Sequence, residues 1–441
     1  MGLVTRLWSA SPRTYTLCLR IVPDLLITGC SQLLTLRGPA PRRGRSLGEL
    51  GILRDGAILV RAGEIQAIGP QNKIERLPQS RRARKIDLAG RVVLPGFVDS
   101  HTHLIFPASR VADYEQRIAG ATYEEIAKRG GGILSSVRKL RRATPDDLKA
   151  RALAHLLEMA AHGTTTVEAK TGYGLDFASE IKSLEIVREL RLEQFLDIAS
   201  TFLGAHVVPP EYRGRADDYV DLLERIWIPY IGRTGLAQFC DVFCDRGAFT
   251  VPQAARILMA GIKSTLTPRI HADQLARTGA ARLAIQLHAA SADHLEKINR
   301  SDIRALAASE VACTLLPGCD FHLGLSHVAP ARELIDAGAA VALATDFNPG
   351  TSPTPSMQMI LSLACANLRM TPAEAIAAAT INGAYALRRH SRVGSLEVGK
   401  FADLSAFDVD DYREIPYYFG VNHCSLVIKR GRIVFDRSQE N

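Results

Sequence analysis

The 441-residue sequence lacks several features that would assign it to a specialised class of protein. It has no uncharged apolar run of about 18 residues or more, so we expect no membrane-spanning helix and no membrane partner. It has no short repeat and no low-complexity tract, which argues against a solenoid or a largely disordered chain. Aromatic residues make up only 6%, whereas hydrophobic residues as a whole make up 47%. This composition is typical of a globular protein with a sizeable core.

The cysteines lack the pattern of a disulfide framework or of a zinc finger. The eight cysteines include no CxxC pair and have no regular spacing. In a chain of this length that pattern indicates reduced thiols, and we therefore expect a cytoplasmic protein. Cys240 and Cys244 share one face of an expected buried strand, where core packing is favoured because a zinc site usually needs a second pair nearby.

The net charge of +8 is spread unevenly. Residues 1–91 carry 16 Lys and Arg against 6 Asp and Glu, so the other 350 residues balance to −2 (38 against 40). The excess lies in segments such as "PRRGRS" and "RRARK", which have no aromatic residues interleaved. Such segments are typical of solvated loops, and we expect no nucleic-acid partner.

The two ends of the chain have the pattern of a small β domain. Residues 1–21 carry three arginines and no acid, and a weak transit peptide, a mis-chosen start codon or a plain extension explains them equally well. Residues 22–90 and 386–441 both read as short strands joined by turns, with Ala62-Gly63 and Arg430-Gly431 at two of the turns. We predict that these two segments form one β-sandwich domain.

The middle of the chain, residues 91–385, alternates short apolar strands with helical segments. Helices such as "TPDDLKARALAHLLEMAAHG" begin at Pro or Asp-rich positions and stop at Gly. Eight parallel strands with eight crossovers predict an α/β fold of the TIM (β/α)8 barrel type. The candidate strands are "GFVDSHTH", "TTTVEAKTG", "DIASTFLGAH", "AQFCDVFCD", "TPRIHAD", "SADHLE", "VACTLLPG" and "VALATDF".

Polar side chains recur at the carboxyl ends of these strands. Barrel enzymes build their active sites on that face, so the recurrence predicts an active site. The residues concerned are His101, His103, Tyr173, His206, Asp245, His271, His294 and Asp346.

The pair His101 and His103 suggests what this site holds. Residues two apart on a strand project to the same side, which inside a barrel is the lumen. A bare HxH is as often a polar strand end as a metal site. Further imidazoles and a carboxylate on other strand ends favour a metal ion, since this donor set suits Zn or Fe with one position open.

These motifs resemble the amidohydrolase superfamily through "LPGFVDSHTH", "IHAD", "SADH" and "ATDFNPGTSP", in this order. More narrowly, the sequence is similar to imidazolonepropionases through "HTHLIFPASR", "KTGYGL", "TFLGAH", "DVFCD", "SADHLE", "LATDFNPGTSP" and "VGSLEVGKFADL". The similarity runs from about residue 50 to 435. It implies a barrel with a flanking β-sandwich, one Zn or Fe ion per chain, and hydrolysis of the cyclic amide 4-imidazolone-5-propanoate to N-formimidoyl-L-glutamate.

The resemblance also implies roles for individual residues. The metal ligands it implies are His101, His103, His271 and Asp346. The catalytic residues are Asp346, which takes a proton from the attacking water, and His294, which polarises the carbonyl or protonates the leaving nitrogen. The substrate carries a carboxylate tail, which Arg110 is implied to bind. The other residues implied to bind the substrate are Tyr123, Tyr173, His206, Gln274, Asn348, Gly350 and Thr351. Family precedent implies a homodimer.

Two departures sharpen this interpretation. Binuclear members of the superfamily bridge their ions with a lysine on the fourth strand, and "AQFCDVFCD" has none, so we predict a single ion. Many deaminases of the superfamily have Glu where this chain has Gln274. An amide cannot act as a general base, so we expect Gln274 to hydrogen-bond the substrate.

Other functions stay open at this point. The missing lysine counts against relatives of hydantoinase and dihydroorotase, and Gln274 counts against an aromatic deaminase. A non-catalytic assembly protein on a hydrolase barrel would have lost metal ligands, and this chain has the full set. We interpret His322 and His327 as solvent-facing loop residues, and the role of Asp245 is not assigned.

Overall fold

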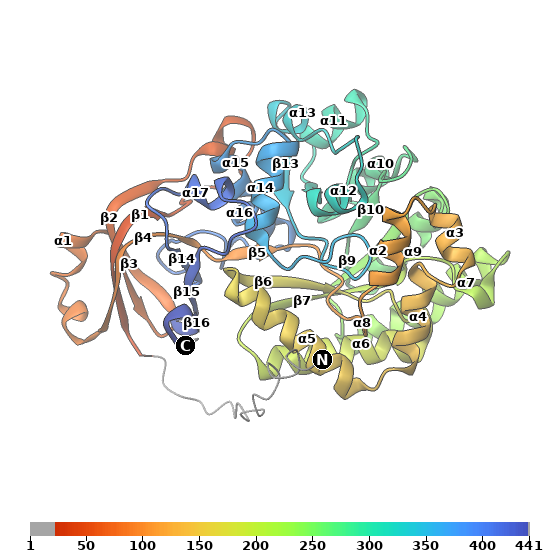
Figure 1. Ribbon diagram of the computed structural model, residues 1–441, viewed down its shortest axis with the longest axis horizontal. Coiled ribbons are helices and arrows are strands. Elements are labelled where there is room, and N and C mark those ends of the chain that lie inside the picture. Colours follow the sequence, from red (N-terminus) through yellow and green to blue (C-terminus); the bar gives the residue numbers. More distant parts are fainter. Residues whose placement is uncertain (1–22, 440–441) are drawn as a thin grey trace.

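The computed structural model describes residues 23–439 and consists of a barrel and a smaller sheet domain that lie side by side (Figure 1). The extension predicted for residues 1–21 lies outside the described residues. No helix in the described range is long and apolar enough to cross a membrane.

The barrel contains the eight predicted strands in sequence order, each hydrogen-bonded in parallel to its neighbour. One position is shared by two short strands, which flank Arg269 and both pair with β8. A parallel bridge between Thr102 and Phe347 joins the first strand position to the last, so the ring closes beside His101, His103 and Asp346. The strands are β5 (Phe97–Asp99), β6 (Thr164–Lys170), β7 (Asp197–Ala205), β8 (Phe239–Cys244), β9 (Thr267–Pro268), β10 (Ile270–Ala272), β11 (Ser291–His294), β12 (Ala312–Leu315) and β13 (Ala340–Leu343). The predicted TIM barrel is confirmed.

The helices of the barrel begin where the sequence supplies capping residues. Thr144 accepts a hydrogen bond from the Asp147 amide at the start of α5, and Pro145 occupies the first helical position, where no amide is needed. Thr250 and Gln253 form a capping box at the start of α9. The helices after β5 are α2 (Val111–Ile118), α3 (Tyr123–Lys128), α4 (Ile133–Arg142), α5 (Pro145–Ala161), α6 (Phe177–Glu193), α7 (Ala216–Leu222), α8 (Ile228–Thr234), α9 (Val251–Lys263), α10 (Ala280–Gln286), α11 (Arg300–Ala307), α12 (Pro317–Leu323), α13 (Ala331–Asp336), α14 (Met357–Asn367), α15 (Pro372–Ala378), α16 (Ile381–Ala386) and α17 (Glu414–Tyr417).

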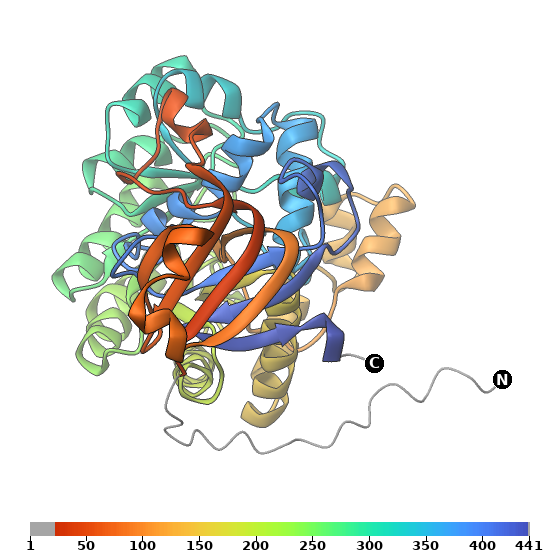
Figure 2. The same cartoon turned by 90° about the vertical axis from the view of Figure 1, so that its left-hand side faces the viewer.

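The two ends of the chain combine into one β domain, as predicted. Figure 2 shows its N-terminal strands, red to orange, beside the C-terminal strands in blue. The strand order is β16-β15-β14-β4-β1-β2-β3, with β1 and β4 parallel and the other pairs antiparallel. The elements are β1 (Leu25–Leu34), β2 (Ile52–Arg61), β3 (Glu64–Pro70), α1 (Gln71–Ile74), β4 (Arg84–Pro95), β14 (Leu404–Phe407), β15 (Cys424–Lys429) and β16 (Arg432–Asp436).

This β domain is one continuous sheet that curls around its own core. Ile58 of β2 and Ile428 of β15 belong to the same buried cluster, although three strands separate β2 from β15 in the sheet. The predicted turn at Ala62-Gly63 is tight, with φ of 49° and 83°, and the Gly63 carbonyl accepts a hydrogen bond from the Ala402 amide. The turn therefore connects the hairpin of β2 and β3 to the segment that leads into β14.

The junction between the two domains positions the first barrel strand. β4 ends at Pro95 and β5 begins at Phe97, so only Gly96 separates the sheet from the barrel. A Cβ atom on Gly96 would lie 2.1 Å from Thr165, and glycine is therefore required for the strands to approach. Phe97 packs on Phe407 of the sheet with ring centroids 5.7 Å apart. The segment that follows β5 carries His101 and His103.

Candidate metal and substrate site

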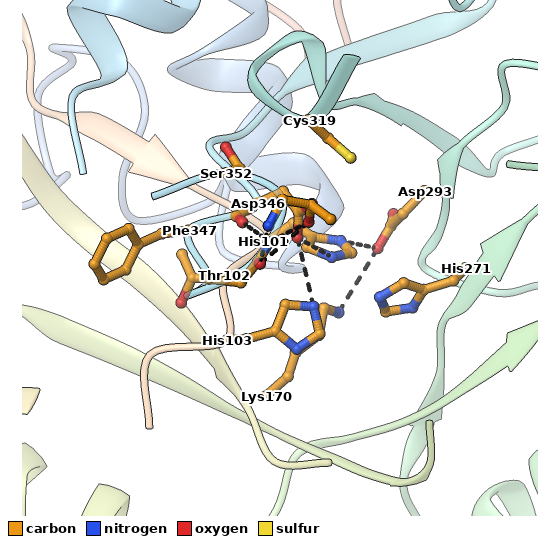
Figure 3. Close-up of polar contacts among 12 residues, drawn as sticks. His101, Thr102, His103, Lys170, His271, Asp293, Cys319, Asp346, Phe347 and Ser352 are labelled. Atoms are coloured by element: carbon orange, nitrogen blue, oxygen red, sulfur yellow. Dashed lines mark hydrogen bonds and ion pairs between the residues drawn. The ribbon is translucent and has the colours of Figure 1, made fainter. Parts of the chain in front are cut away.

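Five buried side chains converge at the carboxyl ends of the barrel strands. Figure 3 shows His101, His103, His271 and Asp346 among them. His101 and His103 follow β5, His271 lies on β10, His294 ends β11, and Asp346 follows β13. His294 and Asp346 have positive φ angles of 82° and 51°. Residues without a glycine's freedom adopt this conformation where the surrounding structure enforces it, often at functional sites.

The distances within this group suit a single cation. Asp346 Oδ1 lies 3.6 Å from His101 Nε2 and 3.5 Å from His103 Nε2. The His271 ring lies 4.6 Å from the His101 ring between centroids. The Nε2 atoms of His101 and His271 are buried and have no hydrogen-bond partner among the described residues. Buried imidazole nitrogens without partners beside a carboxylate are what a metal ion would satisfy, so the residues present fit one.

A second grouping of the same histidines includes His294. Ligand atoms of His101, His271 and His294 lie within 4.8 Å of one another, as do those of His101, His103 and Asp346. His294 differs from the other histidines because Glu296 Oε1 lies 3.2 Å from its Nδ1. Burial lowers the pKa of His294, but the charges of Glu296, Asp346 and Asp320 raise it by more than burial lowers it. The resulting pKa is about 9. His294 therefore carries a proton, and a protonated imidazole is a poor metal ligand.

The pKa values of His101, His103 and His206 are lowered. Burial, followed by the charge of Lys170 and the neighbouring imidazoles, holds the pKa of His101 well below its usual range. Burial and His206 do the same for His103, and burial lowers the pKa of His206 to about 3. These rings are neutral at pH 7, which is the form that binds a metal.

Buried carboxylates set which nitrogen of each ligand histidine faces the centre. His101 Nδ1 donates to Asp293 Oδ2 at 2.7 Å, and His271 Nδ1 lies 3.1 Å from Asp241 Oδ2. A carboxylate at Nδ1 keeps the proton there and leaves the Nε2 lone pair for a ligand. The two histidines are thus prepared for a cation by groups beneath them.

A lysine and an arginine join these carboxylates into one network, which we call the floor (Glu168, Lys170, Asp241, Arg269 and Asp293). Lys170 Nζ lies 2.7 Å from Asp241, 2.8 Å from Glu168 and 3.7 Å from Asp293. Arg269 lies 3.0 Å from Asp293 and 3.3 Å from Glu168. All five side chains are fully buried. The floor pairs two cations with three carboxylates.

The sequence analysis missed the floor, although a signal was present. Glu168 and Lys170 stand two apart on β6, as do Arg269 and His271 across β9 and β10. Charged residues spaced by two within otherwise apolar strands project to one side, here the lumen. The fourth strand has no lysine, as noted, but Lys170 of the second barrel strand reaches its Asp241.

A cavity of about 430 Å³ opens above the histidines. It brings together ten of the predicted residues: His103, Arg110, Tyr173, His206, His271, Gln274, His294, Asp346, Asn348 and Thr351. It also has apolar lining that the sequence analysis did not identify: Ile133, Val207, Phe243, Leu275 and Leu323. A largely apolar pocket with a few convergent polar groups is typical of a small-molecule site.

Arg110 lies on the cavity wall against Gly350. A Cβ atom on Gly350 would lie 1.1 Å from Arg110 Nη2, so Gly350 provides the space for the guanidinium. Gly350 is not among the cavity-lining residues. Arg110 Nε is buried without a hydrogen-bond partner in the part of the chain described, and Asp113 Oδ2 lies 3.8 Å away. This leaves the guanidinium able to bind a carboxylate.

The turn at residues 348–351 is held from within by Asn348. Its Oδ1 accepts hydrogen bonds from the amides of Gly350 and Thr351, both at 2.8 Å. Its Nδ2 donates to the Asp346 carbonyl at 2.6 Å. The side chain predicted to face a ligand therefore mainly fixes the turn that carries Thr351 and Gly350.

Tyr173 and His206 form another part of the cavity wall. His206 stacks on His103 with ring centroids 5.1 Å apart, and its Nδ1 donates to the Gly172 carbonyl at 3.1 Å. Glu180 of α6 accepts hydrogen bonds from the backbone amides on both sides of Tyr173, at 3.1 Å from Gly172 and 2.8 Å from Gly174. Burial raises the pKa of Tyr173, so its phenol stays protonated.

Other predicted residues lie further out. Tyr123 begins α3, and its side chain is outside the described part of the structure. His322 lies on α12, where its ring stacks on Tyr114 at 5.0 Å, so its interpretation as a loop residue was wrong. The sequence pattern concealed this helix because its seven residues follow directly on a strand. His327 is exposed in a loop, as predicted.

A barrel whose strand ends bring three imidazoles and a carboxylate together is the arrangement of a metal-dependent hydrolase. The sequence matches the Amidohydrolase family over residues 84–133 and 127–435. It is 48% identical to the imidazolonepropionase of Geobacillus kaustophilus (strain HTA426) over 414 residues, 93% of this chain and 97% of that one. It is 47% identical to the imidazolonepropionase of Solibacter usitatus (strain Ellin6076) over 416 residues, 94% of this chain and 99% of that one. The chain belongs to the amidohydrolase family and, within it, to the imidazolonepropionases.

Solved structures show the same fold in more distant proteins. An adenosine deaminase from Xanthomonas campestris with bound zinc has a TM-score of 0.67 at 18% identity, covering 94% of this chain and 93% of that one. Guanine deaminase of E. coli has a TM-score of 0.69 at 16% identity, covering 94% and 99%. The predicted relationship to the imidazolonepropionases and the predicted fold are thereby confirmed.

Proposed function

We propose that this enzyme hydrolyses 4-imidazolone-5-propanoate to N-formimidoyl-L-glutamate with one Zn or Fe ion per chain. The observation that carries the proposal is the convergence of three buried imidazoles and Asp346 below a cavity whose wall holds Arg110, in a chain related to imidazolonepropionases. His101, His103, His271 and Asp346 would hold the ion. When bound, such an ion supplies Lewis acidity and a water of lowered pKa.

The residues of the chain account for binding of the substrate. Arg110 pairs with the propanoate tail, because a guanidinium binds a carboxylate with two parallel hydrogen bonds. Tyr173 and His206 pack against the ring, and Thr351 and the Gln274 amide offer hydrogen bonds to its polar edge. The apolar side chains of the wall exclude water from the ring faces.

The chemical step needs two proton transfers. The oxygen of water bonds to the ring carbonyl carbon, the carbon–nitrogen bond of the ring amide breaks, and the leaving nitrogen takes up a proton. Asp346, at the centre of the cluster, takes the proton from water. His294, whose Nδ1 is held by Glu296, presents Nε2 to the cavity and donates to the leaving nitrogen. Gln274 has no proton to transfer and takes no part in this relay.

The direct test is turnover of the substrate by the metal-loaded enzyme. Freshly made imidazolone propionate should lose its ultraviolet absorbance in the presence of the enzyme, and hydantoin propionate serves as the control. Metal analysis should find one equivalent of Zn or Fe per chain. Two equivalents, or full activity after chelation, would contradict the proposal. We also propose that the enzyme is cytoplasmic and that it is a homodimer. Sedimentation of the purified enzyme would test the homodimer.

A further inference from the structure

Asp245 is a buried carboxylate at the site whose role neither the family assignment nor the proposed function explains. It stands directly after β8 and is 3% exposed. Its Oδ2 accepts hydrogen bonds from the amides of Gln274 at 2.7 Å and Leu275 at 2.8 Å. Its Oδ1 accepts from the amides of Ala276 at 3.0 Å and Arg246 at 2.6 Å. Four backbone donors therefore end on one side chain.

Three of these donors belong to a segment without regular structure. β10 ends at Ala272 and α10 begins at Ala280, so residues 274–276 lie between the two elements. Their amides have no backbone carbonyl partner in the described part of the chain. The hydrogen bonds to Asp245 are partly buried, and partly buried amides are more stable with a partner, which Asp245 supplies. The conformation of this segment therefore depends on Asp245.

The same segment delivers two side chains to the cavity. Gln274 and Leu275 both line it, and Gln274 Nε2 lies 3.6 Å from the buried Cys319 Sγ. The amides of Gln274 and Leu275 are held at fixed distances from Asp245, at the end of β8. The backbone from which the Gln274 side chain extends is therefore fixed in position. A shift of the segment would move its amide away from the ligand.

We propose that Asp245 is the positioning residue for Gln274 and thereby sets the affinity for substrate. The proposal rests on the proposed function for its substrate, and it goes beyond it by assigning substrate recognition to a side chain that touches no substrate. The length of the Asp245 side chain matters, because it brings the carboxylate within hydrogen-bond distance of the amides that follow the neighbouring strand β10. Asn in its place would present an NH2 group to donors, and Glu would displace the segment.

The chain contains a matched control in Asp273. This carboxylate is 1% exposed and accepts from the amides of Thr278 at 2.6 Å, Gly279 at 3.0 Å and Ala281 at 2.9 Å. It therefore holds the start of α10, which does not line the cavity. Both aspartates bind backbone amides, but only Asp245 holds the segment that carries Gln274.

The first experiment needs no substrate. Amide hydrogen exchange of the full-length enzyme should become at least about tenfold faster at residues 274–276 in Asp245→Asn and at residues 278–281 in Asp273→Asn. Unchanged exchange at 274–276 in a folded Asp245→Asn enzyme overturns the proposal. If Asp245→Asn does not fold, Asp245→Glu gives the same local readout. Because hydrogen exchange is measured without turnover, failure of this proposal can be distinguished from failure of the proposed function.

The second experiment is a double-mutant cycle on turnover of imidazolone propionate. Asp245→Asn should raise KM about tenfold with a smaller change in kcat, and Asp245→Glu should restore part of the affinity. In a Gln274→Ala background the same substitution should raise KM less than about twofold. Independent effects of the two substitutions, or an equal rise of KM in Asp273→Asn, would show a general loosening and reject the assignment.

Discussion

The floor and the rim of the cavity both contain charged residues, but they use their charges differently. On the floor, Lys170 and Arg269 are fully buried and paired with carboxylates. The rim is the part of the cavity wall at Arg110 and the adjoining Gly350; here Arg110 is partly exposed, and Asp113 Oδ2 is 3.8 Å away. Charges that are already paired cannot bind a ligand, whereas an incompletely paired guanidinium can. The floor should therefore govern metal binding and stability, and the rim should govern KM.

The largest effect is expected between the two regions, at the ligands themselves. His271→Ala removes one of the buried imidazoles, and kcat/KM should fall about a thousandfold or more, because the chemistry supplied by a bound metal is worth several kcal/mol. Metal analysis should show a chain with less than one equivalent. Chelation of the unmodified enzyme should match this loss, and re-addition of the metal should restore only the unmodified enzyme.

The next effect tests the floor. Lys170→Met leaves Asp241 and Asp293 without their shared cation, so metal affinity should fall about 10- to 100-fold and the free energy of unfolding by about 3 kcal/mol or more. Metal titration and urea unfolding measure the two quantities.

Lys429→Met is the matched control for this substitution. Lys429 is 2% exposed and bridges Asp197, at 2.7 Å, and Asp403 in the β domain. Lys429→Met should lower the free energy of unfolding by a similar amount without changing metal affinity. Equal losses of metal affinity in the two variants would contradict a specific role of the floor in metal binding.

The rim is tested by Arg110→Met and Gly350→Ala. Either change removes or displaces the guanidinium, since a Cβ atom on residue 350 would overlap it. KM should rise about 10- to 100-fold with a smaller change in kcat, as charged hydrogen bonds to a carboxylate are worth about 1.5–3 kcal/mol. The matched control is the propanamide analogue of the substrate. The unmodified enzyme should bind it weakly, and the two variants should no longer distinguish it from the acid.

The smallest effect concerns an ion-pair cluster on the outside of the barrel. Asp302 of α11 pairs with Arg277 and Arg282 at 2.7 and 2.9 Å. Burial raises the pKa of Asp302, but these hydrogen bonds outweigh it and bring the pKa down to about 2. Because the pKa in the folded state is below the ordinary value of 3.8, the stabilisation is present above about pH 4 and is lost between pH 4 and pH 2.

Asp302→Asn should therefore lower the free energy of unfolding by about 1 kcal/mol at pH 7, a modest value because the two arginines are nearly half exposed. The difference from the unmodified enzyme should narrow as the pH falls below 4, measured by urea unfolding. A difference that is constant from pH 7 to pH 3 would contradict the assignment. KM should stay unchanged throughout.

Much of the fold follows from local patterns in the sequence. The eight barrel strands are short apolar runs bounded by capped helices, and Thr144 and Thr250 cap α5 and α9 where the sequence places them. His101 and His103 could be assigned to one side of a strand because the side-chain period of a strand is two. These features depend on neighbours within a few residues, so they can be read from the chain alone.

The sequence determined which side chains stand at the strand ends, and the resemblance to the imidazolonepropionases suggested their roles. Only the tertiary structure decided what lies beneath and beside them. Lys170 meets Asp241 across 71 residues, and Asp245 meets the Gln274 amide across 29. Such pairings arise when strands distant in the chain become neighbours in the ring, and no local pattern specifies which carboxylate will face which donor.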